Sequence, residues 1–196
     1  MKNIIILLFF TGFNAYSQEM PLTTNFNVLI RESYGDLNKD GQLDRVIISM
    51  DTVNETRPFK LQVFFTDPHG HSKLFFSSTT LVTPMYPKEL NGEHNGSQIP
   101  DVSIENGKLQ IDFYIKGNSS YQFRYKNESF ELVHYTHVHW DGESITETEF
   151  NLLTGKYTKQ TEHLEKKEIT LQIEKEVILT PLPQLENFIP FESELY

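Results

Sequence analysis

The chain has 196 residues, a formal net charge of −10 at neutral pH and no cysteine. Its length is sufficient for one domain with a sizeable hydrophobic core. An acidic surface repels phosphate backbones and anionic lipids, which argues against nucleic acid and membrane surfaces as partners, and without cysteine neither a disulfide bond nor a lipid anchor on cysteine is possible.

Residues 1–17 have the pattern of a secretory signal peptide. Lys2 precedes the apolar run 4–10, and Ala15 and Ser17 place small residues at the −3 and −1 positions before Gln18. The run is too short for a spanning helix, although an uncleaved anchor is the alternative. We therefore expect export to the periplasm or the cell exterior, a single β-rich domain over residues 18–196, and no membrane span after cleavage. Loss of Lys2 changes the net charge from −10 to −10 − 1 = −11.

The stretch from Gly35 to Asp44 has the spacing of a calcium loop. Side-chain oxygens fall at relative positions 1, 3, 5 and 9, glycine falls at position 6, and a backbone carbonyl at position 7 completes the set: Asp36, Asn38, Asp40, Asp44, Gly41 and Gln42. Ca²⁺ prefers roughly six to eight oxygen ligands, which such a loop can supply. Position 12 is Ile47 rather than the Glu of an EF-hand, and alternating residues flank the loop, so we expect strand, loop, strand. A purely polar turn is the alternative.

The loop and the apolar strand after it resemble the calcium loop of FG-GAP and VCBS-type repeats, which joins two strands of a hairpin. The resemblance implies Ca²⁺ as cofactor and the ligands Asp36, Asn38, Asp40, Gln42 (by its carbonyl) and Asp44. The motif occurs once, so a complete propeller is not expected. The layout is also similar to small secreted bacterial proteins of uncharacterised function, which share two later segments but imply no activity: Asn151 to Lys156 and Leu185 to Phe188.

The rest of the chain has the two-residue alternation of β strands, and aromatic residues at 13% suit a β core. Asn106-Gly107 is a hairpin turn signal between two such runs, and turns at Gly117-Asn118 and Asn127-Glu128 continue the pattern. We predict an all-β fold, an antiparallel meander or sandwich-like sheet with one calcium-loop hairpin. Leu185 to Phe188 is expected to form a short helix that packs on the sheet.

Two segments interrupt this pattern. Residues 83–100 contain three prolines and little periodicity, and long loops often contact ligands, although an inert connection is the alternative. His137 and His139 share a strand face, which suggests a zinc or copper site with Glu143 or Asp141 as third ligand. The competing interpretation is a half-buried β surface that carries histidines. His69 and His71 offer a second pair.

No catalytic signature is present: the sequence lacks G-x-S-x-G, H-E-x-x-H, a phosphate-cradling glycine loop and a cysteine nucleophile. We therefore expect an exported, non-enzymatic protein in which calcium is mainly structural. One alternative is a carbohydrate- or surface-binding module that uses the 83–100 loop and sugar stacking on Trp140, although a lone tryptophan in a β protein more often lies in the core. The other alternative is a metal-dependent hydrolase built on His137 and His139.

Overall fold

A computed structural model describes residues 25–96, 98–115 and 117–196, so the expected signal peptide lies outside the described residues. The described residues form strands and two short 3₁₀ helices, η1 and η2. These are β1 (Phe26–Gly35), β2 (Asp44–Asp51), β3 (Phe59–Thr66), β4 (Ser72–Ser78), η1 (Lys88–Leu90), β5 (Asp101–Glu105), β6 (Lys108–Phe113), β7 (Asn118–Lys126), β8 (Ser129–Trp140), β9 (Ser144–Asn151), β10 (Lys156–His163), β11 (Glu168–Glu176) and η2 (Leu185–Asn187).

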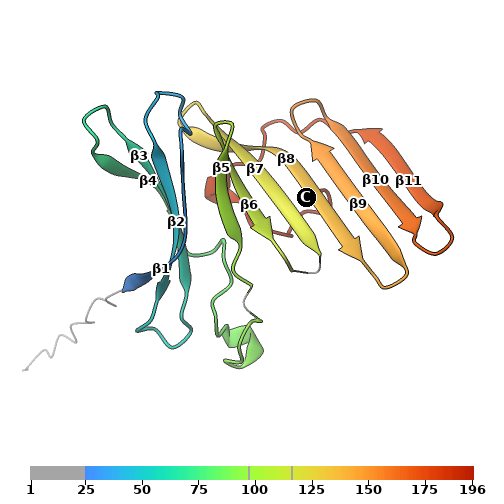
Figure 1. The fold of residues 1–196 in the computed structure, drawn as a ribbon, viewed down its shortest axis with the longest axis horizontal. Coiled ribbons are helices and arrows are strands. Elements are labelled where there is room, and N and C mark those ends of the chain that lie inside the picture. Colours follow the sequence, from blue (N-terminus) through green and yellow to red (C-terminus); the bar gives the residue numbers. More distant parts are fainter. Residues whose placement is uncertain (1–24, 97, 116) are drawn as a thin grey trace, which may run out of the picture.

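Within the described ranges the strands form two antiparallel meanders. Sheet A has the order β1-β2-β3-β4, and sheet B has the order β11-β10-β9-β8-β7-β6-β5. Figure 1 shows sheet B broadside, with β5 next to sheet A and β11 at the far edge. The predicted all-β antiparallel fold is confirmed, including the β5–β6 turn, where Asn106 and Gly107 both have positive φ.

The alternation in the sequence places one face of each sheet in a common core. In β6 the buried residues Leu109, Ile111 and Phe113 alternate with half-buried polar ones. We call this the inner face of sheet B and the opposite, polar face its outer face. Side chains of sheet A pack on part of the inner face, since the rings of Phe65 and Phe75 contact that of Tyr125 with centroids 4.8 and 5.3 Å apart.

The two sheets meet where β1 lies against β5. The Ile104 amide donates a hydrogen bond of 3.1 Å to Ser33 Oγ. The two strands approach each other so closely that a Cβ on Gly35 would lie 2.5 Å from Ile104 Cγ2. Glycine at position 35 is therefore required by the contact between the sheets.

Residues 177–196 cover a further part of the inner face. The Leu132 amide donates to the carbonyl of Pro183, and a bridge pairs Glu131 with Gln184, which holds this C-terminal segment beside β8. Leu185 and Phe188 are then 1% and 5% exposed. The predicted short helix that packs on the sheet is confirmed as η2.

We expect Phe188→Ala to lower the free energy of unfolding by about 3–5 kcal/mol, the usual cost of removing a buried ring. Phe188 contacts Tyr121 and Phe123 with ring centroids 4.9 and 5.2 Å apart. Ile189 is 52% exposed, so Ile189→Ala is a matched control that should change stability by less than about 1 kcal/mol. Urea unfolding measures both, and equal effects would show that the segment does not close the core.

Gly35→Ala is expected to destabilise the fold by about 1–3 kcal/mol, because the added methyl group overpacks the contact with Ile104. The double variant Gly35→Ala/Ile104→Ala should lose less stability than the sum of the losses in the two single variants, since Ile104→Ala removes the obstructing methyl group. A double-mutant cycle by urea unfolding gives the coupling energy. Simple additivity would contradict the close approach of β1 and β5.

Candidate functional site

The predicted calcium loop connects β1 to β2 and is closed by the pair Gly35↔Asp44. The strand, loop, strand context expected from the sequence is therefore confirmed. Two residues of the loop have left-handed backbone, Lys39 at φ 65° and Gly41 at φ 84°. Glycine adopts this conformation without steric cost, which accounts for its place at the sixth position.

The side chains of the loop fold inward and organise its backbone. Asp36 accepts hydrogen bonds from the amides of Lys39 and Asp40 at one carboxylate oxygen, at 2.6 and 3.1 Å, and from Gly41 at the other, at 2.9 Å. Asp40 Oδ1 accepts from the Gln42 amide at 2.8 Å, and Asp40 Oδ2 accepts from Asn38 Nδ2 at 2.9 Å. The acidic side chains thus share one small loop.

Asp44 is the one member of the predicted ligand set that is fully buried, at 0% exposure. Its Oδ2 accepts from the Leu37 amide at 2.8 Å, and its Oδ1 accepts from the Thr66 amide at 3.0 Å. Burial raises the pKa of this carboxyl group and the Asp40 carboxylate adds to the rise, while the backbone amides of Thr66, Leu37 and Asn38 oppose it. Asp44 therefore ties the loop to the end of β3 and carries a charge that its surroundings only partly compensate.

The donor set suits a hard cation, because it consists of oxygens alone. An ionised carboxylate offers about four acceptor positions, so one to three amide hydrogen bonds leave capacity for a metal. Among the described residues, however, no three acidic or histidine side chains lie close enough together to hold a metal ion. Asp36, Asp40 and Asp44 therefore do not form a ready-made set of ligands. Coordination by the loop would require a rearrangement of its carboxylates.

His137 and His139 lie on the inner face of sheet B beyond the packed core. A bulge in β8 opposite Gln122 and Phe123 shifts the register, so that Tyr135, His137 and His139 follow one another on this face with nearly parallel rings. The predicted shared face is confirmed. His137 Nδ1 shares a hydrogen bond of 2.8 Å with Ser119 Oγ, a buried group that sequence reasoning missed.

The expected third metal ligand is not in place beside these histidines. Asp141 Oδ1 accepts from the amides of Glu143 and Ser144 at 3.0 and 2.7 Å, which makes it a turn residue. Burial lowers the pKa of His137, and the neighbouring His139 and Lys159 lower it further. In the described part of the chain no group of three histidine or acidic side chains lies here. The arrangement resembles the competing interpretation from the sequence, a half-buried β surface that carries histidines.

The second histidine pair lies in the turn between β3 and β4. His71 Nδ1 is 3.1 Å from Asp67 Oδ2, and the rings of His69 and His71 are 6.2 Å apart at their centroids. Asp67 also accepts from the amides of both histidines. Asp67 and the two histidines therefore form an exposed polar turn.

The buried side chain of Asn95 helps to fix the 83–100 segment. Asn95 is 4% exposed, and its Nδ2 donates to the carbonyls of Thr83 and Pro84 at 3.2 and 2.6 Å. In the sequence Asn95 begins an Asn-Gly pair and an N-x-S triplet, and neither pattern predicts its structural role. A cavity of about 370 Å³ lies between this segment and the β2–β3 turn, lined by Glu55, Thr56, Tyr86, Lys88, Asn91 and Gly92.

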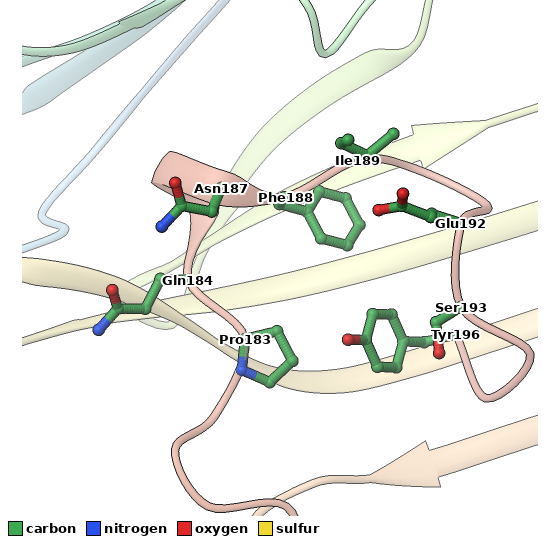
Figure 2. A pocket seen from close by; sticks show the side chains of 8 residues that line it. All are labelled: Pro183, Gln184, Asn187, Phe188, Ile189, Glu192, Ser193 and Tyr196. Carbon is green, nitrogen blue, oxygen red and sulfur yellow. The ribbon is translucent and has the colours of Figure 1, made fainter.

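A second cavity, of about 210 Å³, lies within the C-terminal segment. Figure 2 shows it between Pro183, Phe188 and Tyr196, with the Glu192 carboxylate near its rim. The Phe188 and Tyr196 rings are 6.3 Å apart at their centroids. Since Phe188 also fills the core, this hollow belongs to the packing of the segment, and no sequence signal singled it out.

Trp140, at the end of β8, is 63% exposed. A lone tryptophan in a β protein more often lies in the core. Trp140 does not, because β8 extends past the part of sheet B that the core covers. Sugar stacking on Trp140 stays a prediction.

Comparisons with known proteins give no match: no family model fits the sequence, and no curated protein or solved structure is significantly similar to it. In the described ranges, neither 3₁₀ helix has the length and apolar character needed to cross a membrane.

The lowered pKa of His137 predicts a loss of stability in mild acid. As the pH falls below about 6.5, a histidine in the unfolded chain takes up a proton before His137 does in the fold, so the free energy of unfolding falls. We expect a smaller fall in His137→Gln than in the wild type when urea unfolding at pH 7.5 and pH 5 is compared. His69→Gln changes an exposed histidine and is the control; equal pH dependence in His137→Gln and the wild type would contradict the prediction.

Proposed function

We propose that the chain is an exported, non-enzymatic β protein whose first hairpin is stabilised by Ca²⁺ bound to Asp36, Asn38, Asp40, the Gln42 carbonyl and Asp44. The observation that carries the proposal is the complete burial of Asp44 at the closing position of a loop with calcium spacing. A buried carboxylate is costly unless it is paired or coordinates a metal. Export is inferred from the pattern of residues 1–17, and calcium outside cells reaches levels that suit sites of modest affinity.

The hydrogen bonds of Asp44 support the choice of this loop as the site. Leu37 and Thr66 provide two amide donors, yet no cationic side chain forms an ion pair with Asp44 in the described residues. The Asp40 carboxylate, which has the same sign, contributes to the raised pKa of Asp44. A divalent cation between Asp40 and Asp44 would reverse this repulsion.

Bound calcium would stabilise more than the loop. Thr66 lies at the end of β3, and Thr66 Oγ1 donates to the Leu43 carbonyl at 2.8 Å. Asp36 lies beside the β5–β6 turn, since a Cβ on Gly107 would be 3.4 Å from the Asp36 carbonyl oxygen. A cation here would therefore fix a point where β1, β3 and sheet B meet.

Thermal and urea unfolding of the purified chain in EDTA, calcium or magnesium tests this proposal. For a dissociation constant of about 10⁻⁴–10⁻³ M, about 10 mM calcium should add roughly 1.4–2.7 kcal/mol to the free energy of unfolding. Magnesium should add less, because it demands stricter geometry and loses its water reluctantly. Asp40→Ala should abolish the calcium-dependent gain, because it removes an exposed ligand of the loop.

Asp67→Ala is the matched control. Asp67 also accepts hydrogen bonds from backbone amides in a turn, so its removal is expected to lower stability. Calcium should nevertheless add as much to the free energy of unfolding of this variant as it adds to that of the wild type. A wild-type chain with the same stability in EDTA and in calcium would show that Asp36 to Asp44 is only a polar turn.

A further inference from the structure

Six side chains lie on the outer face of sheet B, near the β6–β7 and β8–β9 turns. Ser120 pairs with Thr136, and Asn118 pairs with Val138. Trp140 lies two residues beyond Val138 on the same side of β8, and Tyr114 directly follows Phe113, whose side chain points inward. We call Tyr114, Asn118, Ser120, Thr136, Val138 and Trp140 the outer strip.

Both aromatic rings of the outer strip are open to solvent. Trp140 is 63% exposed and Tyr114 is 61% exposed, while Val138 between them is 39% exposed. Tyr114 is held in place, because its hydroxyl donates to Asp101 Oδ2 at 3.2 Å and Arg31 holds the other oxygen of that carboxylate at 2.6 Å. An exposed, anchored ring is suited to a ligand that stacks on it.

The polar side chains between the rings have unused hydrogen-bonding capacity. Of the residues that the structure describes, none forms a side-chain hydrogen bond with Asn118, Ser120 or Thr136. An amide and two hydroxyl groups can donate and accept at the same time. Such groups match a ligand that is rich in hydroxyls.

Carboxylates border the outer strip on both sides. On the β9 side, Glu147 lies opposite Val138 and Glu149 lies opposite Thr136. On the β6 side, Asp112 lies opposite Ser120. These charges repel an anionic ligand and accept hydrogen bonds from hydroxyl groups. The charge pattern therefore disfavours an anionic ligand and suits one that is rich in hydroxyl groups.

We propose that the outer strip binds an uncharged polysaccharide, with sugar rings stacked on Trp140 and Tyr114 and sugar hydroxyls bonded to the polar groups between them. β6 and β8 are two strand spacings apart, so the two rings are separated by roughly 10 Å or more. That span exceeds one sugar ring, so consecutive residues of a chain are engaged. The calcium loop contacts the opposite end of β6, at Gly107, so the two sites are independent.

Affinity electrophoresis tests the proposal with three uncharged polysaccharides in the gel: hydroxyethyl cellulose, glucomannan and xylan. Polygalacturonate serves as the anionic control. The wild-type chain should be retarded by at least one uncharged polysaccharide and not by polygalacturonate. Trp140→Ala and Tyr114→Ala should each weaken that binding about tenfold or more, since each removes one of the two aromatic contacts.

Tyr34→Ala is the matched variant, because Tyr34 is an exposed tyrosine, at 54%, on β1 of sheet A. It should bind like the wild type, and circular dichroism should show all three variants folded. Measurements in EDTA and in calcium separate this proposal from the proposed calcium site. Absence of retardation by all three uncharged polysaccharides, retardation unchanged in both ring variants, or equal retardation by polygalacturonate would each overturn the proposal.

Discussion

The apolar inner face of sheet B must be covered, and this requirement decides the arrangement of the rest of the chain. Sheet A covers the part near β7 and β8 with Phe65 and Phe75, and residues 177–196 cover the neighbouring part with Phe188. Neither cover reaches β11, which is exposed along its whole length. Since buried apolar area is the main stabilising term, the core fixes β5 to β10, where Phe150 of β9 and Tyr157 of β10 are still buried, and leaves the outer face and β11 to solvent.

Asp44 lies under a different constraint, because it is polar and yet as deeply buried as the core. The Leu37 and Thr66 amides satisfy its two oxygens but do not neutralise its charge. Burial of an ionised carboxylate is unfavourable in the absence of a counter-charge. An apolar residue here would leave the Thr66 amide unpaired, so the hairpin gains from a carboxylate, and the carboxylate would gain from the proposed cation. This reciprocity links the fold of the first hairpin to the proposed ion.

The sequence predicted what depends on local pattern, namely the strands, the Asn106-Gly107 turn and the loop between β1 and β2. It did not predict the division into two sheets, because that depends on whether β4 pairs with β5 across the irregular 83–100 segment. The bulge in β8, which brings His137 to Ser119, and the burial of Asn95 arise from tertiary contacts. Trp140 was misplaced because its exposure depends on how far β8 extends past the core.

The two proposed sites differ in what makes them rigid. Ser120 and Thr136, in the middle of the outer strip, lie on β7 and β8, whose inner side chains Tyr121 and Tyr135 are packed in the core, so the positions of these two polar groups are set before any ligand arrives. Preorganisation of this kind lowers the entropic cost of binding. The loop from Asp36 to Gly41 has only Leu37 in the core and is otherwise organised by its own side chains. A bound ion would therefore add rigidity where the core gives little support, and the proposed calcium site lies at such a place.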